Sequence, residues 1–491
     1  MKYDCLIKGA TIIDGQNQPS YLADVAIIDD EIVAIGQLDA THAKRVVDAK
    51  GLVLSPGFID VHTHDDTNVI RMPECIPKIS QGVTTTIVGN CGISASPAVL
   101  TDEPPDPMNL LGERKDFKYP TFSSYVDAVN DAEPAVNVAT LVGHTTLRNN
   151  VMDDLYRPAT PEEIGVMKKQ LRHALNEGAL GLSTGLAYAS AKRCEEREVL
   201  ALTQELTRVN AIYTTHLRTE FEGILDAMDE AFRVGMATKV PVVISHLKCA
   251  GAGNWGRAHE VLEKMEHARQ SLEVGCDCYP YSASSSTLDL KQVTHDYPIF
   301  ITWSASLPDL AGKMLSEIAG ELGLSLLDAA KKLQPAGAVY HNMDVDDVER
   351  VLQYPLTMIG SDGLPNDPHP HPRLWGAFPR VLGYYCRERK LFPLTTAIHK
   401  MTGLSARRFN LVKRGEIKVG NFADLVLFNP DEITDSASFR QPKQAAQGIH
   451  TVWVNGKISY QQSTGVQGRH GRFLRRENTE LASSEIMEIN S

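Results

Sequence analysis

The sequence predicts an α/β fold, a (β/α)8 barrel of the TIM type, joined to a small β-sandwich domain that both chain ends build. Three observations predict it. Short apolar runs alternate with amphipathic helical segments through the middle of the chain, strand-like alternation fills both ends, and 491 residues exceed one ordinary domain. The hydrophobic fraction of 43% is typical of a chain that buries a sizeable core.

The first 55 residues have the pattern of strands separated by turns, because apolar and polar residues alternate and glycines punctuate the runs. The same pattern returns in residues 413–475. Chain ends often lie close together in folded domains. We therefore expect residues 1–55 and 413–475 to form one composite β-sandwich domain, and the polar residues 476–491 to form a loose C-terminal tail.

Residues 56–412 contain the predicted barrel. Longer segments between the apolar runs, such as 161–178 and 223–235, carry apolar residues at helical spacing. The stretch between the last two runs is too long for one βα unit, so we expect an insertion at about 283–342. Eight runs match the strand number of the barrel, and they lie at 58–62, 84–90, 136–144, 178–184, 211–216, 240–246, 272–279 and 356–362.

The polar residues that can carry chemistry fall where these runs end. Six of them are His62, His64, Cys91, His216, His246 and Asp362. Barrel active sites are built at the carboxyl ends of the strands. Taken alone, His216, His246 and Cys91 are each more often structural, whereas the pair His62 and His64 is stronger evidence for a metal, and the alternative role of Asp362 is that of a helix N-cap. Together they predict a metal site, and imidazole with thiolate suits Zn²⁺.

Charge and hydropathy argue against two kinds of partner. The net charge is −12 and no basic run is long enough to hold a phosphate backbone, so we expect no nucleic-acid partner. No apolar stretch is long enough to span a bilayer, and the first residues lack the apolar block of a signal peptide. We therefore expect a cytoplasmic protein with a small-molecule substrate and no membrane partner. No sequence pattern indicates an oligomeric state.

The motif PGFIDVHTHDD resembles the opening signature of the amidohydrolase superfamily of metal-dependent hydrolases. VGNCG, TTHLR, SHLK, GSDG and HPHPR together resemble its D-aminoacylase branch, the N-acyl-D-amino-acid deacylases. The resemblance covers nearly the whole chain, and a composite β-sandwich and a barrel insertion are both known in that branch. Cys91 is more specific to this branch than the HxH motif, because many other amidohydrolases bridge two metals with a carboxylated lysine or a glutamate instead.

The resemblance implies a tightly bound zinc ion held by Cys91, His216 and His246. It also implies that Asp362 and the two histidines of the first run complete a second, weaker position or surround the first. Three protein ligands leave a fourth position for water, as in catalytic zinc sites. Zinc lowers the pKa of that water toward ~7. Whether one or two metals work in the enzyme is left open.

Asp362 is also the predicted general base and acid. It would accept a proton from the metal-activated water and deliver it to the departing amine. The family uses a lysine, a tyrosine and an arginine to hold the α-carboxylate of the substrate, and the matching residues here are Lys248, Tyr279 and Arg373. An arginine can clamp a carboxylate through two parallel hydrogen bonds. For His144, at the end of the third run, a structural role and a role behind the ligands are equally open.

We therefore predict zinc-dependent hydrolysis of N-acyl-D-amino acids, which are linear amides, to a D-amino acid and a carboxylate. One alternative is another amidohydrolase activity, on a cyclic amide or related C–N bond, which a carboxylated lysine in place of Cys91 would favour. Another is a non-catalytic assembly protein on a hydrolase scaffold, although such proteins typically lose metal ligands. The preferred side chain is open between hydrophobic and acidic. An acidic one would need a second cation, such as Lys291 in the insertion.

Overall fold

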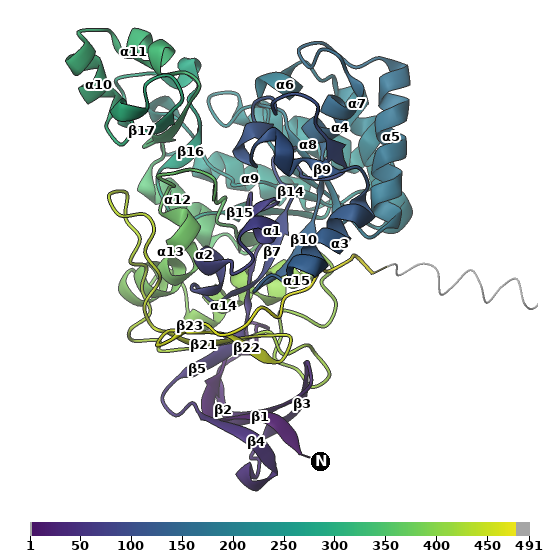
Figure 1. The fold of residues 1–491 in the computed structure, drawn as a ribbon, viewed down its shortest axis with the longest axis vertical. Helices are drawn as coiled ribbons and strands as arrows, with labels where there is room; N and C mark the ends of the chain where they lie inside the picture. The colour runs from purple at the N-terminus through teal and green to yellow at the C-terminus, as the bar shows by residue number, and fades with distance from the viewer. Residues whose placement is uncertain (1, 478–491) are drawn as a thin grey trace, which may run out of the picture.

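Parallel strands in the middle of the chain form the core of the fold (Figure 1). The computed structural model describes residues 2–477. Each strand of the series hydrogen-bonds to the next, and β10 and β11 are two parts of one run interrupted at Leu141. The series consists of β6 (Phe58–Asp60), β7 (Val83–Val88), β10 (Asn137–Thr140), β11 (Val142–Gly143), β12 (Gly181–Gly185), β13 (Ile212–His216), β14 (Val242–Ile244), β15 (Val274–Cys278) and β19 (Thr357–Ile359).

The two ends of this series meet. Thr63, after β6, forms a parallel bridge to Gly363, after β19. Each of the eight apolar runs that the sequence predicts as strands overlaps one of these strands, and the third overlaps both β10 and β11. The molecule therefore has an α/β fold of the TIM-barrel type.

Capping residues mark the start of some of the helices, as α5 (Pro161–Asn176) shows. The Thr160 side chain accepts from the backbone N–H of Glu163, the Glu163 carboxylate accepts from the N–H of Thr160, and a proline occupies the first turn. Met167 and Leu171 lie on its buried face. The other helices around the strands are α1 (Asn68–Arg71), α2 (Ile76–Ile79), α3 (Phe122–Ala132), α4 (His144–Val151), α6 (Ala189–Lys192), α7 (Glu196–Thr203), α8 (Ile224–Thr238), α9 (Ala258–Ala268), α12 (Val345–Gln353), α13 (Arg373–Arg380), α14 (Leu394–Met401) and α15 (Gly403–Arg408).

A nine-stranded sheet joins the two ends of the chain, below the barrel in Figure 1. The junction is the antiparallel pair of β5 and β20, in which Leu54 lies opposite Leu427. Ile7 and Trp453 belong to the same fully buried apolar cluster as these two leucines. The strands are β1 (Tyr3–Ile12), β2 (Tyr21–Ile28), β3 (Glu31–Gly36), β4 (Ala43–Asp48), β5 (Val53–Pro56), β20 (Leu425–Phe428), β21 (Ile449–Val454), β22 (Lys457–Gln461) and β23 (Gly465–Val466).

The first residue of the predicted loose tail contacts the rest of the fold. Arg476 is only 5% exposed, and its guanidinium donates to the backbone oxygens of Leu175, Ala179 and Val209. Carbonyl groups near the end of a helix such as α5 lack partners inside the helix, and the arginine supplies donors for them. Residues 478–491 of the predicted tail lie outside the described residues. Of the helices in the described part, none has the length and apolar character needed to cross a membrane.

Residues 284–340, between β15 and β19, form a small unit with its own apolar cluster. Its three strands pair antiparallel in the order β16, β18, β17. Figure 1 shows α10 and α11 at the upper left, beside the barrel. The elements are β16 (Ser284–Thr287), β17 (Ile299–Ser304), α10 (Leu315–Leu322), α11 (Leu326–Leu333) and β18 (Ala336–Tyr340), and a separate short pair, β8 (Ala98–Val99) with β9 (Lys118–Tyr119), follows β7.

Candidate active site and metal centre

The six residues predicted as metal ligands lie together at the carboxyl ends of β6, β7, β13, β14 and β19. They form two groups, and the donor atoms within each group lie within 4.8 Å of one another. Cys91 belongs to both groups, so its sulfur stands between two adjacent positions. The groups are His62, His64, Cys91 and Asp362, and Cys91, His216 and His246.

Close contacts connect these donor atoms. The Cys91 Sγ lies 3.2 Å from Nε2 of His62 and 3.4 Å from Nε2 of His246. The Asp362 Oδ1 lies 3.1 Å from Nε2 of His64 and 3.5 Å from Nε2 of His62. Imidazole, thiolate and carboxylate atoms that converge in this way have the chemistry of a zinc site.

Three of the six residues have a left-handed backbone. The φ angles are +53° at Cys91, +36° at His246 and +48° at Asp362. Such conformations cost about 1–3 kcal/mol for a residue other than glycine, and they concentrate at functional sites. The loop of Cys91 also packs tightly on β12, because a Cβ on Gly92 would lie 2.6 Å from the backbone nitrogen of Gly185. The surrounding fold therefore holds the sulfur in a constrained place.

Two histidine nitrogens without hydrogen-bond partners also fit a zinc site. Nδ1 of His64 and Nδ1 of His216 are buried and have no hydrogen-bond partner among the described residues. Buried polar atoms in folded proteins are nearly always paired. Both histidines therefore have a ring nitrogen that is available to a group from outside the protein.

The charges around the sulfur favour the thiolate. Burial acts to raise the pKa of the Cys91 thiol, but the imidazoles of His62 and His246 outweigh burial and hold this pKa well below its ordinary value. The thiolate is the form that binds a metal. Burial likewise acts to raise the pKa of Asp362, and the charge of Arg373 above all holds it well below the usual range. The carboxyl group is therefore ionised at neutral pH.

Two carboxylates that the sequence analysis missed orient the histidines. Asp277 Oδ1 lies 3.2 Å from Nδ1 of His62 and accepts from the backbone N–H of His246 at 2.9 Å. Glu220 Oε1 lies 2.8 Å from Nδ1 of His246. Carboxylates in such places fix the orientation of a ligating imidazole. Side chains alternate between the two faces of a strand, so Asp277 points away from the cysteines on either side of it. This alternation is a signal by which the sequence could have identified Asp277. Glu220 lies in a loop and offers no such signal.

Arg373, predicted to bind a substrate carboxylate, begins α13 and is 1% exposed. Its Nη2 lies 2.9 Å from Asp362 Oδ2 and donates to the backbone oxygen of Ser285 at 3.1 Å. Its Nε and Nη1 have no partner among the described residues. Because unpaired buried N–H groups are costly, these two groups are available to an acceptor from outside the protein.

The other two predicted substrate residues lie beside Arg373. The centroid of the Tyr279 ring is 4.4 Å from the Arg373 guanidinium and 5.7 Å from Lys248 Nζ. Lys248 is already engaged, since Nζ donates to Glu220 at 2.5 Å and lies 2.8 Å from Nδ1 of His246. Burial raises the pKa of Tyr279 to about 12. The phenol therefore remains protonated and can donate a hydrogen bond at neutral pH.

His144 lies outside both groups of donor atoms. Its Nε2 is 2.8 Å from Glu198 Oε1, and Arg148 Nη1 donates to the two Glu198 oxygens at 2.7 and 2.8 Å. Burial acts to raise the pKa of Glu198, but the histidine and the arginine lower it to about 2. This buried ion group lies at the start of α4, where the N–H of Thr145 donates to Gly92 O at 2.7 Å. This buried group therefore lies where it can support the loop that carries Cys91.

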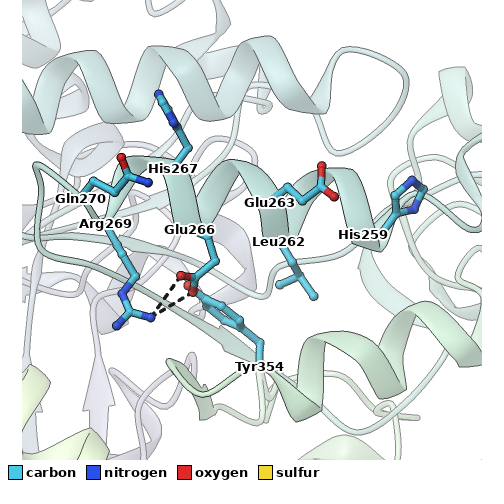
Figure 2. Close-up of a pocket in the computed structure, with 8 residues that line it drawn as sticks. All are labelled: His259, Leu262, Glu263, Glu266, His267, Arg269, Gln270 and Tyr354. Carbon is cyan, nitrogen blue, oxygen red and sulfur yellow. Dashed lines mark hydrogen bonds and ion pairs between the residues drawn. The ribbon is translucent and has the colours of Figure 1, made fainter.

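A cavity of about 700 Å³ lies along α9, as Figure 2 shows, and none of the predicted ligands lines it. A second cavity, of about 900 Å³, lies among residues 97–103, 120–122, 149–153 and 169–174, again without them. The reactive groups are instead packed in the interior, where charges interact more strongly than in water. The first cavity is lined by His259, Leu262, Glu263, Glu266, His267, Arg269, Gln270 and Tyr354.

Known proteins match this chain over most of its length. The model of the amidohydrolase family matches residues 45–460. The chain is 47% identical to the D-aminoacylase of Alcaligenes xylosoxydans xylosoxydans, over 96% of this chain and 98% of that protein. It is also 47% identical to the N-acyl-D-aspartate deacylase of the same organism, over 96% of this chain and 95% of that protein.

A solved structure gives the same result at the level of the fold. The N-acyl-D-glutamate deacylase from Bordetella bronchiseptica, complexed with zinc and a phosphonate inhibitor that mimics the tetrahedral intermediate, is 42% identical to this chain. The TM-score is 0.93, with 97% of this chain and 100% of that chain covered. The resemblance of this chain to the D-aminoacylase branch is thereby confirmed. With the family model matching most of its residues, this chain belongs to the amidohydrolase family.

Proposed function

We propose that this protein is a zinc-dependent hydrolase that converts an N-acyl-D-amino acid and water into a D-amino acid and a carboxylic acid. The observation that carries this proposal is one buried juxtaposition. Asp362 belongs to the cluster of metal-type donors around Cys91, and it contacts Arg373, whose guanidinium keeps unpaired donors. The full-length relatives named above, which act on N-acyl-D-amino acids according to their names, support it.

The residues that would hold the metal fall into two sets, and Cys91 belongs to both. A bound zinc ion supplies Lewis acidity, which polarises the amide carbonyl and makes water a better nucleophile near neutral pH. Asp277 and Glu220 hold two of the imidazoles in orientation. The tightly bound ion is assigned to Cys91, His216 and His246, and the second position to His62, His64 and Asp362 beside the same sulfur.

Asp362 moves the proton in the proposed reaction. The low pKa of this carboxyl keeps it ionised before the reaction, so that it can accept a proton from the attacking water. The protonated carboxyl then delivers this proton to the amide nitrogen, which leaves as an amine. Contacts with His64 at 3.1 Å and Arg373 at 2.9 Å aim the two carboxylate oxygens.

Arg373 holds the α-carboxylate of the substrate, with Tyr279 and Lys248 beside it. With the carboxylate and the acyl carbonyl both fixed, two directions remain at the stereocentre, one for the hydrogen and one for the side chain, and a side-chain pocket as the third contact accepts the side chain in only one of them. An L-substrate would direct its side chain to the place of the hydrogen. This three-point arrangement is the proposed basis for the preference for D-amino acids.

A panel of N-acetyl-D- and N-acetyl-L-amino acids tests the proposed function. We expect turnover of D-substrates and far slower turnover of their L-counterparts. The panel includes methionine, aspartate and glutamate derivatives, because the side chain of Lys291 is exposed and supports no preference for acidic substrates. Turnover of a cyclic amide without turnover of any N-acyl-D-amino acid would contradict the proposal and favour the alternative activity.

Replacing Cys91 with alanine should weaken zinc binding by more than about 100-fold, beyond the range that is typical for the loss of a group that only supports a ligand. Activity should fall together with metal content, because the sulfur belongs to both donor groups. The measurements are elemental analysis after dialysis and turnover before and after added zinc. Cys276→Ala is the matched control, since that thiol is equally buried but contacts Thr357 Oγ1 at 3.2 Å. Full zinc content and activity in Cys91→Ala would show that the thiol is not a ligand.

We also propose the finer division of the fold. Residues 1–55 and 413–475 form one composite β-sandwich domain, and residues 56–412 form the (β/α)8 barrel with its insertion. The pairing of β5 with β20 and the shared apolar cluster of the two chain ends support the first part. The separate apolar cluster of residues 288–340 supports the insertion.

A further inference from the structure

A buried lysine outside the donor groups connects the two chain segments that carry three of the proposed ligands. Lys78 lies in α2 and is 1% exposed. Its Nζ donates to Asp60 Oδ2 at 2.8 Å, Thr63 Oγ1 at 2.8 Å and Ser361 Oγ at 2.9 Å. It also lies 3.1 Å from Asp65 Oδ2. One ammonium group therefore contacts the segment after β6 and the segment after β19.

Both segments carry ligands of the second metal position. The first contains His62 and His64, and Ser361 directly precedes Asp362. Their backbones also pair, since the N–H of Asp362 donates to His62 O at 2.7 Å and the N–H of His64 donates to Gly363 O at 3.0 Å. The two ends of the parallel series thus meet at the place where the ligands emerge.

The hydrogen bonds around the ammonium form a closed network. Ser361 donates through Oγ to Asp60 Oδ2 at 2.6 Å and through its N–H to Oδ1 at 2.8 Å. Thr63 Oγ1 donates to Asp65 Oδ2 at 2.5 Å. Burial acts to lower the pKa of Lys78, but the two carboxylates outweigh burial and raise it. Without this cation, two buried carboxylates would lose the charge that compensates them.

We propose that Lys78 is a positioning residue that fixes His62, His64 and Asp362 relative to one another and thereby sets the affinity of the second metal position. The inference rests on the proposed function. Lys78 acts through the chain segments that bear the ligands, because its contacts are with residues next to them. Loss of such outer support typically costs about 10–100-fold in metal affinity.

The test is a zinc titration of the full-length metal-free protein against a competing chelator. In Lys78→Met, which keeps the length of the side chain and removes its charge, we expect the weaker binding step to lose roughly 10–100-fold in affinity. The tighter step, assigned to Cys91, His216 and His246, should change much less. A loss of general stability would not produce this difference between the two steps.

Lys400→Met is the matched control. Lys400 is also 1% exposed, lies in α14, and donates to the backbone oxygens of Tyr354 and Thr357. Thr357 begins β19, whereas Asp362 follows its other end. This variant removes a buried ammonium at the opposite end of the same strand. Its Tm should fall while both zinc-binding steps keep their affinities.

If Lys78→Met does not fold, Ser361→Ala provides the test of the inference. This variant removes one partner of the Lys78 ammonium and one hydrogen-bond donor to Asp60. It should weaken the same binding step. An unchanged weaker step in a folded Lys78→Met or Ser361→Ala protein overturns the inference, and so does an equal loss in Lys400→Met. A single binding step in the wild type also overturns it and leaves the proposed reaction intact, since the substrate panel tests that reaction separately.

Discussion

Asp362→Asn should lower kcat for N-acetyl-D-methionine by about 10²- to 10⁴-fold, the usual contribution of a general acid–base group. The amide keeps the shape of the side chain but cannot accept the proton of the attacking water. The tightly bound zinc should stay, because Cys91, His216 and His246 are unchanged. Steady-state kinetics and metal analysis of the same preparation measure the two expectations.

Asp347→Asn provides the control for Asp362→Asn. Asp347 is also buried, and its carboxylate accepts from the backbone N–H groups of Gly256 and Ala258 at the start of α9. It lies outside both donor groups, so kcat should not change when it is replaced. Near-normal kcat in Asp362→Asn would assign the proton transfer to another group.

Arg373→Ala should cost about 2–5 kcal/mol in kcat/KM, the range for truncating one partner of a buried charge pair. Two losses add here. The substrate loses its carboxylate clamp and can tilt away from the reactive geometry, and Asp362 loses the cation 2.9 Å from its Oδ2. The pKa of that carboxyl then rises, so both KM and kcat should suffer. Arg373→Lys should recover only part, because an ammonium cannot form two parallel hydrogen bonds.

The measurement compares N-acetyl-D-methionine with its α-amide, which lacks the carboxylate charge. The wild type should strongly prefer the acid, and Arg373→Ala should lose most of that preference. Arg380→Ala is the control from the same helix, since Arg380 pairs with Asp435 at 3.2 Å instead, and it should keep the preference. An acid-to-amide ratio that is unchanged in Arg373→Ala would exclude this residue as the clamp.

The strands and the donor groups of the site could be predicted because both leave local signals. A buried parallel strand is a short apolar run, and His216 and His246 stand out because each is a polar residue at the end of one. Glu220, in a loop, leaves no comparable signal, and Asp277 leaves only its alternation with the neighbouring cysteines. Their importance depends on which side chains meet across the site, such as the contact of Glu220 with Lys248, 28 residues away in sequence.

Composition was also a poor guide for residues whose partners are distant. Arg476 stands in a polar segment, yet its guanidinium is buried. It donates to backbone carbonyl groups far away in the sequence, such as that of Ala179, 297 residues earlier. Lys78 has the sequence environment of an ordinary helical lysine. Only the closure of the strand series places it between the segments after β6 and β19.

The pairing of β5 with β20 has a consequence for how the protein is made. A ribosome adds about 5–20 residues per second, so β5 waits roughly 20–70 s before β20 has been synthesised. Until then the edge of β5 that faces β20 exposes unpaired N–H and C=O groups, to which strands of other chains can add. The nascent chain therefore carries an open sheet edge through most of its translation.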